Sequence, residues 1–162
     1  MAYATTTEVP VERSKAQIEA LLTKYGAQGY HTGWQAADGD DPGWDAVEFM
    51  WKSKVIRFRV PRPLPKKADG KYHAWATDRY GYRLADAKMQ KAIDQQNRSR
   101  WRVLFLVIKA KLEAVEAGVS IFEDEFLSFI VTGSGRTVGE ILLPRLAAGQ
   151  LQLEAGGGED VH

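Results

Sequence analysis

The chain contains no cysteine, and this absence excludes a disulfide scaffold, a thiol nucleophile and a thiolate-bound metal ion. Histidine is scarce as well. His31, His73 and His162 are the only three, and no two of them lie one helical turn apart. A zinc site built on a helix is therefore not expected. We predict neither a metal ion nor a cofactor for this protein.

Long apolar runs are also missing. The longest wholly apolar stretch, Val103–Ile108, is far shorter than the roughly 20 residues that a membrane-spanning helix needs. Residues 1–10 lack the basic segment followed by an apolar segment that marks a secretory signal. A length of 162 residues with 44% apolar content is enough for one domain with its own core. We therefore expect a cytoplasmic protein that makes no membrane contact.

Charge is unevenly distributed along the chain. Residues 52–102 hold 15 basic and four acidic residues, a net charge of +11, whereas the rest holds seven basic and 17 acidic residues, a net charge of −10. The near-neutral total of +1 conceals this asymmetry. Basic segments attract polyanions, so the pattern indicates a phosphate-rich partner. A basic segment can equally neutralise an acidic segment of the same or another subunit, and this alternative stays open.

The first predicted element is a helix. Residues 1–12 are expected to form a disordered lead-in. Ser14 and Gln17 have the spacing of a capping box, which predicts a helix start at this point. Apolar residues then recur every three or four positions as far as Tyr25, and Gly26 is a suitable residue to end the helix.

Three strands are predicted next, over residues 28–36, 44–51 and 55–60. In the second and third, apolar side chains alternate with others, so one face of the sheet is expected to be buried. A tight turn at Lys52 and Ser53 connects these two strands. The charged residues expected on the opposite face are Glu48, Arg57 and Arg59.

Prolines at positions 61, 63 and 65 end the strand pattern and begin a long basic loop, residues 62–79. A helix over residues 84–117 follows, with a possible break at residues 97–99 and an end at Gly118. The pairs Ser120 and Glu123, then Thr137 and Glu140, predict capping boxes for two short helices, the second kinked or stopped by Pro144.

The predicted fold is therefore α+β: a helix, a three-stranded antiparallel sheet, a long central helix and two short C-terminal helices. Residues 13–118 form the αβββα core in this prediction. Residues 119–150 form a helical extension, and residues 151–162 form a flexible tail.

The basic window also predicts a binding surface. Five helix positions between 88 and 102 have 3-4-3-4 spacing, and they form one stripe if the helix is continuous. Cations along a track contact successive phosphates, and aromatic rings within the window, Tyr80 and Tyr82 among them, can stack on bases. The alternative is a solvated helix face with aromatic core residues. The predicted nucleic-acid-binding residues are Lys52, Lys54, Arg57, Arg59, Lys66, Lys67, Tyr72, Trp75, Lys88, Lys91, Arg98 and Arg102.

Two further motifs share some features with phosphate-binding or metal-binding catalytic sites. The turn at residues 133–137 is Gly-rich and opens a helix, but it lacks the Lys-Ser/Thr ending of a P-loop, so a plain turn is favoured. The acidic residues between 38 and 48 can hold Mg²⁺ in principle, yet the Glu-x-Lys pattern of a nuclease core is absent after Glu48. A polar turn is the favoured interpretation, and no catalytic residue is predicted.

Several segments carry a resemblance to known proteins. Residues 100–102, 109–116, 122–127 and 135–140 are similar to a family of small proteins encoded by tailed phages, prophages and their bacterial hosts. The resemblance covers most of the chain and implies intracellular work connected with a mobile element.

The helix–three strands–helix order is also similar to that of double-stranded RNA-binding domains. Those domains open their last helix with a Gly-x-Lys-Lys-type motif, whereas residues 80–84 here contain no paired lysines. The preceding loop is also much longer. No RNA-binding residue is therefore transferred to this chain.

The leading hypothesis is a non-catalytic protein of a phage or mobile element that binds the phosphate backbone of DNA or RNA. The alternative is a protein-binding module, either a homo-oligomer or an effector acting on a host protein. In it, the acidic residues 113–125 would pair with the basic window of a neighbouring copy. The least favoured alternative is a Mg²⁺-dependent nuclease using Asp40, Asp41 or Glu48.

Overall fold

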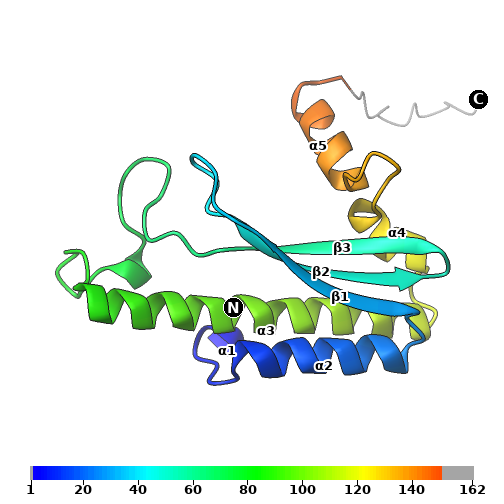
Figure 1. Cartoon of the computed structure of the whole chain (residues 1–162), viewed down its shortest axis with the longest axis horizontal. Helices are drawn as coiled ribbons and strands as arrows, with labels where there is room; N and C mark the ends of the chain where they lie inside the picture. The colour runs from blue at the N-terminus through cyan, green and yellow to red at the C-terminus, as the bar shows by residue number, and fades with distance from the viewer. Residues whose placement is uncertain (1, 151–162) are drawn as a thin grey trace, which may run out of the picture.

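A three-stranded antiparallel sheet forms the middle of the protein in the computed structural model, which describes residues 2–150 (Figure 1). The strands are β1 (Gly29–Gln35), β2 (Trp44–Trp51) and β3 (Lys54–Pro61), and they lie in the order β1-β2-β3. The α+β class and all three strands were predicted, with boundaries that differ by one residue at most. Local alternation was sufficient for β2 and β3, because their inner-face side chains at alternate positions are buried, whereas no residue of β1 is buried.

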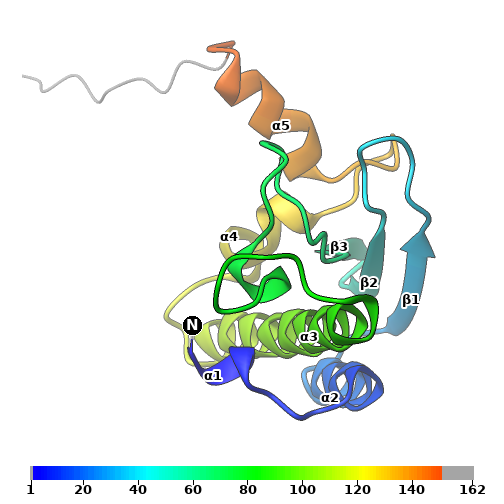
Figure 2. The same cartoon turned by 90° about the vertical axis from the view of Figure 1, so that its left-hand side faces the viewer.

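One face of the sheet is covered by the helices α2 (Val11–Lys24) and α3 (Asp86–Glu116), which pack against each other (Figures 1 and 2). The buried side chains of β2 and β3 on this inner face are those that the alternation predicted. The central members of the core are Ile18, Leu22, Val47, Phe49, Ile56, Phe58, Val60, Trp101, Leu104, Ile108 and Leu112. Glu48, Arg57 and Arg59 consequently lie on the outer face, as expected.

Helix α3 runs unbroken through residues 97–99 for 31 residues. Ser99 and Trp101 are buried there, so packing against the sheet and α2 holds the segment in the helix. Gly118 follows with a φ of 70°, and Gly26 follows α2 with a φ of 90°. Both glycines adopt the left-handed conformation that ends helices, as predicted.

The C-terminal part extends the same core. Helix α4 (Phe122–Phe126) and the short 3₁₀ helix η2 (Leu127–Phe129) place aromatic rings against the sheet. The rings of Phe58 and Phe129 stack with centroids 4.1 Å apart. Helix α5 (Val138–Ala147) then packs on η2 and projects away from the sheet (Figure 1). The capping box of Thr137 and Glu140 is present, and Pro144 lies inside α5 without ending it.

The start of the chain differs from the prediction. Residues 2–5 form a short helix, α1 (Ala2–Thr5), where a disordered lead-in was expected. Ala4 is buried, and the side-chain amide of Gln95 donates to the carbonyl oxygens of Thr5 and Thr7, both at 3.0 Å. Contacts with α3 thus order a segment whose own sequence gives no helix signal.

Two predicted capping boxes were wrong. Helix α2 begins after Pro10, so Ser14 lies inside the helix and is buried in the interface instead of capping it. Helix α4 begins after Ile121, and Ser120 makes no capping bond. The predicted flexible tail, residues 151–162, lies outside the described residues. Among the helices of residues 2–150, none is both long enough and apolar enough to cross a bilayer.

Candidate nucleic-acid interface

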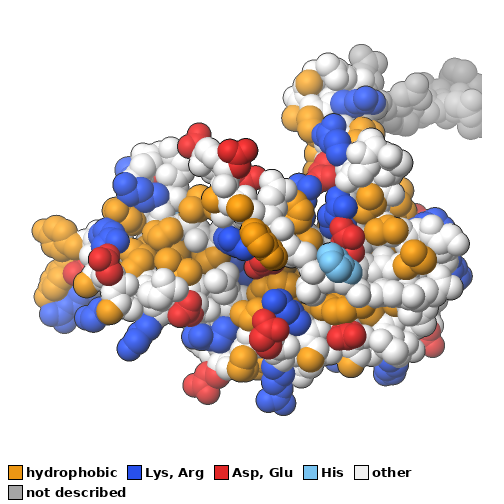
Figure 3. All heavy atoms as spheres, in the orientation of Figure 1, with side chains coloured by type: hydrophobic (Ala, Val, Ile, Leu, Met, Phe, Trp, Pro, Cys, Tyr) orange, Lys and Arg blue, Asp and Glu red, His pale blue; other side chains and the backbone are white. Residues whose placement is uncertain are grey.

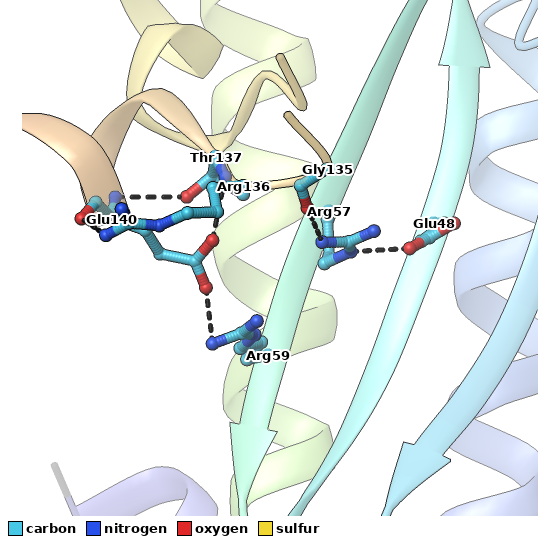
Figure 4. A network of polar contacts seen from close by, with 7 residues as sticks. All are labelled: Glu48, Arg57, Arg59, Gly135, Arg136, Thr137 and Glu140. Atoms are coloured by element: carbon cyan, nitrogen blue, oxygen red, sulfur yellow. Dashed lines mark hydrogen bonds and ion pairs between the residues drawn. The ribbon is translucent and has the colours of Figure 1, made fainter. Parts of the chain in front are cut away.

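The arginines on the outer face of the sheet are held in ion pairs (Figure 4). Arg57 donates from Nε to Glu48 at 2.5 Å and from Nη1 to the carbonyl oxygen of Gly135 at 2.8 Å. Arg59 pairs with Glu140 of α5 and lies over the ring of Trp44, 4.2 Å from its centroid. Each predicted sheet arginine therefore has a carboxylate partner, and this face is not an open cationic surface.

A cleft of about 710 Å³ lies where α5 leaves the sheet. Arg57, Arg59 and Arg136 line it together with Glu140, Leu143 and Pro144. Arg136 is itself occupied, since its Nη2 donates to the carbonyl oxygen of Glu140 at 2.6 Å. The charged side chains that line the cleft therefore connect α5 to β3, through the ion pair of Glu140 with Arg59.

The predicted stripe on α3 lies on the other side of the sheet from Arg57 and Arg59. Its middle is covered by the N-terminal segment, which Gln95 contacts, and Arg98 donates to Gln95 at 2.5 Å. Arg102 donates to Gln17 of α2 at 2.6 Å. The continuous helix aligns the stripe as predicted. The C-terminal members of the stripe, Arg98 and Arg102, are however used in contacts between helix side chains. The stripe does not join the sheet arginines in one surface.

Lys52 and Lys54 lie at the β2–β3 turn, at the opposite end of the molecule from the long loop (Figure 1). Lys54 pairs with Glu123 of α4 at 3.4 Å. The pKa of Glu123 is lowered, first by its own backbone amide and then by its hydrogen bond with Lys54. These two lysines therefore belong to the turn and the α4 contact, not to the loop surface.

The remaining predicted residues do gather. Residues 62–91 comprise the loop after β3 and the first turns of α3, and they hold eight basic and three acidic residues, a net charge of +5. We call this region the basic end. Figure 3 shows basic and hydrophobic side chains together over this end of the molecule, at its left. The predicted site residues that it contains are Lys66, Lys67, Tyr72, Trp75, Lys88 and Lys91.

Most cations of the basic end have no acidic partner. Arg62 pairs with Asp45 at 3.4 Å and Arg83 pairs with Asp86 at 2.8 Å. The hydrogen bond that Arg83 donates to Asp86 also raises the pKa of Arg83. Within residues 2–150, no ion pair forms at the other cations, which are Lys66, Lys67, Lys71, Arg79, Lys88 and Lys91.

Aromatic rings accompany these cations. The loop is ordered by a short 3₁₀ helix, η1 (Ala74–Ala76), whose Ala76 is buried. A turn follows in which Asp78 accepts hydrogen bonds from the amides of Tyr80 and Tyr82, at 2.8 and 3.0 Å. This turn holds both tyrosines outward, 69% and 72% exposed.

The predicted aromatic residues of the loop are less accessible. Tyr72 and Trp75 are partly buried, and Trp75 stacks on His73 with centroids 5.8 Å apart. Tyr80 and Tyr82 were predicted only as rings that can stack on bases, and neither they nor Lys71 and Arg79 were among the predicted binding residues. The Asp-x-x-Gly turn over residues 78–81 is the signal that could have placed the two tyrosines among the binding residues.

The acidic residues of the least favoured hypothesis are used in other ways. Asp38 and Asp41 exchange main-chain hydrogen bonds across a turn, and Glu48 pairs with Arg57. Among the described side chains, no group of three or more His, Asp or Glu residues is arranged to hold a metal ion. The Gly-rich segment over residues 133–137 is a turn whose last residue caps α5, as favoured.

A scan of family models, a search of curated proteins and a search of solved structures each found no match to this chain. The similarity to phage-encoded proteins therefore stays a prediction.

Proposed function

We propose that this is a non-catalytic nucleic-acid-binding protein and that the basic end is its binding surface. The observation that supports the proposal is the group of six cations without ion pairs beside two exposed tyrosines. Unpaired lysines attract phosphates without first losing an internal partner. The role in a phage or mobile element is part of the same proposal and rests on the sequence resemblance.

The proposed surface is smaller than the one predicted from sequence. Arg57 and Arg59 are left out because each forms an ion pair with a carboxylate. Arg98 and Arg102 are left out because each donates a hydrogen bond to a glutamine side chain on a helix. Lys52 and Lys54 lie at the other end of the molecule. The surface that remains combines Lys66, Lys67, Lys71, Arg79, Lys88 and Lys91 with Tyr80 and Tyr82.

The exposed rings favour single-stranded ligands. A base that is paired in a duplex stacks on its neighbours and offers no free face, whereas an unpaired base can stack on a tyrosine. The ring of Tyr80 also has the guanidinium of Arg79 at 4.6 Å from its centroid, so a stacked base would lie beside a cation. We therefore expect tighter binding to single-stranded than to double-stranded DNA or RNA of equal length.

The test is fluorescence anisotropy with labelled single- and double-stranded oligonucleotides across a salt series. We expect log K to fall linearly with log salt. The slope should be roughly −3 to −4 on single strands if four to six phosphates are contacted, since each contributes about −0.7. A variant with Lys66, Lys67 and Lys71 all changed to Glu should bind at least about tenfold more weakly.

The matched control changes Lys24, Lys52 and Lys109 to Glu, three exposed lysines on other parts of the molecule. It alters the net charge by the same amount, so it should keep most of the affinity if the basic end is the surface. Absence of binding at low salt would refute the proposal. An equal loss in both variants would also refute it, because it would show attraction by net charge alone.

A further inference from the structure

The outer edge of β1 is open along the whole strand. β1 pairs with β2 alone, and none of its residues is buried. The edge of β3 at the other side of the sheet is partly covered, because Val131 donates to Val55 and Arg100 donates to Pro61. Figure 2 shows β1 at the rim of the sheet, with no described helix or strand beyond it. The edge of β1 is therefore free to take another strand.

The register of the sheet determines which main-chain groups lie on this edge. Trp51 faces Lys54 across the two-residue turn of the β2–β3 hairpin, so these residues form a hydrogen-bonded pair. Alternation then directs the main-chain groups of Met50 toward β1, and the bond from the amide of Gln28 to the carbonyl oxygen of Met50 at 2.8 Å agrees. Within residues 2–150, no hydrogen bond outside the sheet reaches the groups that point away from β2. These are the amides and carbonyls of Tyr30, Thr32 and Trp34.

The edge lacks the features that usually keep sheet edges apart. Proteins protect such edges with lysine, proline or other charged residues, but β1 contains no proline and no Asp, Glu, Lys or Arg. Residues 25–37 are the longest stretch of the chain without those four charged residue types. Any charge on this edge would meet a like charge on a second copy of the chain, so an uncharged edge favours pairing between identical chains.

We propose that β1 pairs with β1 of a second copy, so that two three-stranded sheets join into one of six strands. Two copies related by a two-fold axis pair their β1 strands antiparallel, and an axis at Thr32 places this residue opposite itself. All residues of Gly29–Gln35 are then paired. Three facing pairs exchange two main-chain hydrogen bonds each, and they use every outward amide and carbonyl of the strand.

The side chains that face each other in this register fit together. On the inner face of the sheet, Tyr30 lies opposite Trp34 of the second copy, an aromatic pair that covers a tryptophan now 72% exposed. Thr32 lies opposite Thr32 of the second copy, and a threonine pair of this kind forms a hydrogen bond. On the outer face, the ring of His31 lies opposite Gly33, which has no side chain to clash with it.

The helix next to this edge does not oppose the pairing. Helix α2 lies beside β1, since the hydroxyl of Tyr30 donates to the carbonyl oxygen of Lys15. It holds three basic and two acidic residues, so two copies of α2 near the axis carry little net charge. The edge and its surroundings are thus compatible with an identical partner.

Sedimentation velocity of the full chain tests the proposal. We expect a reversible monomer–dimer equilibrium in which the dimer predominates at about 100 μM protein. The paired strands carry no charge, so raising the salt concentration from about 0.1 to 1 M should not weaken the dimer. This result separates the proposal from pairing of the acidic residues 113–125 with the basic window of a neighbouring copy, which salt would weaken.

Charge at position 32 tests the register. Thr32 is exposed, so its substitution should leave the monomer folded. Thr32→Lys and Thr32→Glu each place like charges opposite each other at the axis, and each should weaken dimerisation about tenfold or more. An equimolar mixture of the two variants should restore the dimer, because opposite charges then face each other. The matched control is Ser134→Lys, at an exposed residue in the turn before α5, and it should dimerise like the wild type.

A cysteine provides a test that does not depend on charge. The chain has no cysteine of its own, so Thr32→Cys introduces one thiol per copy. Directly opposite residues of a hydrogen-bonded pair have Cα atoms about 5.5 Å apart, a separation that a disulfide spans. Mild oxidation should therefore link Thr32→Cys into a covalent dimer, whereas Ser134→Cys should remain largely unlinked under the same conditions.

Four results would overturn the inference. They are a monomer at about 0.5 mM protein, equal dimerisation of Thr32→Lys and Ser134→Lys, no dimer when the Lys and Glu variants are mixed, and equal cross-linking of the two cysteine variants. The triple Glu variant of the basic end should dimerise normally. This inference and the proposed function can therefore fail separately, since a monomer that still binds single-stranded DNA would refute the dimer alone.

Discussion

Arg136 supplies the hydrogen bond that Pro144 removes from helix α5. In an α-helix the carbonyl oxygen of Glu140 would accept from the amide of residue 144, but proline has no N–H. The guanidinium of Arg136 donates to this oxygen instead, at 2.6 Å (Figure 4). This bond explains why α5 continues to Ala147 when its proline was expected to kink or stop it.

The first prediction follows from this replacement. Arg136→Ala should destabilise the protein by about 1 kcal/mol, because it leaves the carbonyl of Glu140 without a donor. The same change in a Pro144→Ala background should cost less, since alanine restores the main-chain amide. Urea denaturation of the four proteins gives the double-mutant cycle that measures the coupling. Equal costs in both backgrounds would show that Arg136 does not replace the missing amide.

Alkaline pH provides a second prediction. The hydroxyl of Tyr30 donates to the carbonyl oxygen of Lys15 at 3.3 Å, and burial with nearby Glu19 and Glu12 raises its pKa from 10.0 to about 12. A raised folded-state pKa favours the neutral form. The stability from Tyr30 is therefore complete below pH 10 and is lost as the pH rises toward about 12.

Tyr30→Phe removes this ionisation. The variant should lose less stability than the wild type between pH 10 and 12, and its absorbance titration at alkaline pH should lack one late-titrating phenol. Tyr80→Phe is the control, because Tyr80 is 69% exposed and its loss should leave the pH dependence of stability unchanged. Identical alkaline unfolding curves for Tyr30→Phe and the wild type would contradict the prediction.

The fold was predictable where local patterns carry the information. Alternation along β2 and β3 follows from burial of one sheet face, and the spacing on α3 follows from burial of one helix face. Ser14 shows the limit of this reasoning. Its capping pattern is sound, but packing of α2 against α3 extends the helix back to Val11 and buries the serine.

The candidate site was harder to predict because charge counts ignore which face carries the charge. The two-residue turn already sets Glu48 opposite Arg57, so that ion pair could have been inferred from register. A helix that buries an apolar sheet face must also lie opposite Arg57 and Arg59, so the helix stripe could not join them. The pair of Arg59 and Glu140 was beyond prediction, since it depends on how α5 docks.

Acid pH provides a third prediction. Ser120 and then Lys111 lower the pKa of Glu125 below its ordinary 4.5. Lys111 reaches both the carboxylate, at 3.3 Å, and the carbonyl oxygen of the same residue, at 2.8 Å. A lowered folded-state pKa contributes stability above pH 4.5 that is lost as the pH falls through the lowered value.

Glu125→Gln should therefore lower the melting temperature at pH 7, and this effect should shrink as the pH falls through the lowered pKa and the wild-type carboxyl becomes protonated as well. Glu116→Gln changes a carboxylate that forms no ion pair within residues 2–150 and serves as the control. A Tm difference between Glu125→Gln and the wild type that stays constant from pH 3 to 7 would show that the effect is not electrostatic.

The final prediction concerns the C-terminal extension, which α4 joins to the core. The ring of Phe126 is fully buried and lies edge-on to Phe49 and Phe58, with centroid distances of 6.0 and 6.2 Å. Phe126→Ala should lower the free energy of unfolding by about 3–5 kcal/mol, because it leaves a cavity between α4 and the sheet.

Leu127→Ala is the matched control, since this neighbouring side chain is 53% exposed and its removal should cost far less. Urea unfolding followed by both circular dichroism and tryptophan fluorescence would measure the two variants. If the extension shares the core, the two probes should report one transition shifted as a whole by Phe126→Ala. A separate early transition, with the main one unchanged, would instead mean that residues 119–150 unfold independently of the sheet and α3.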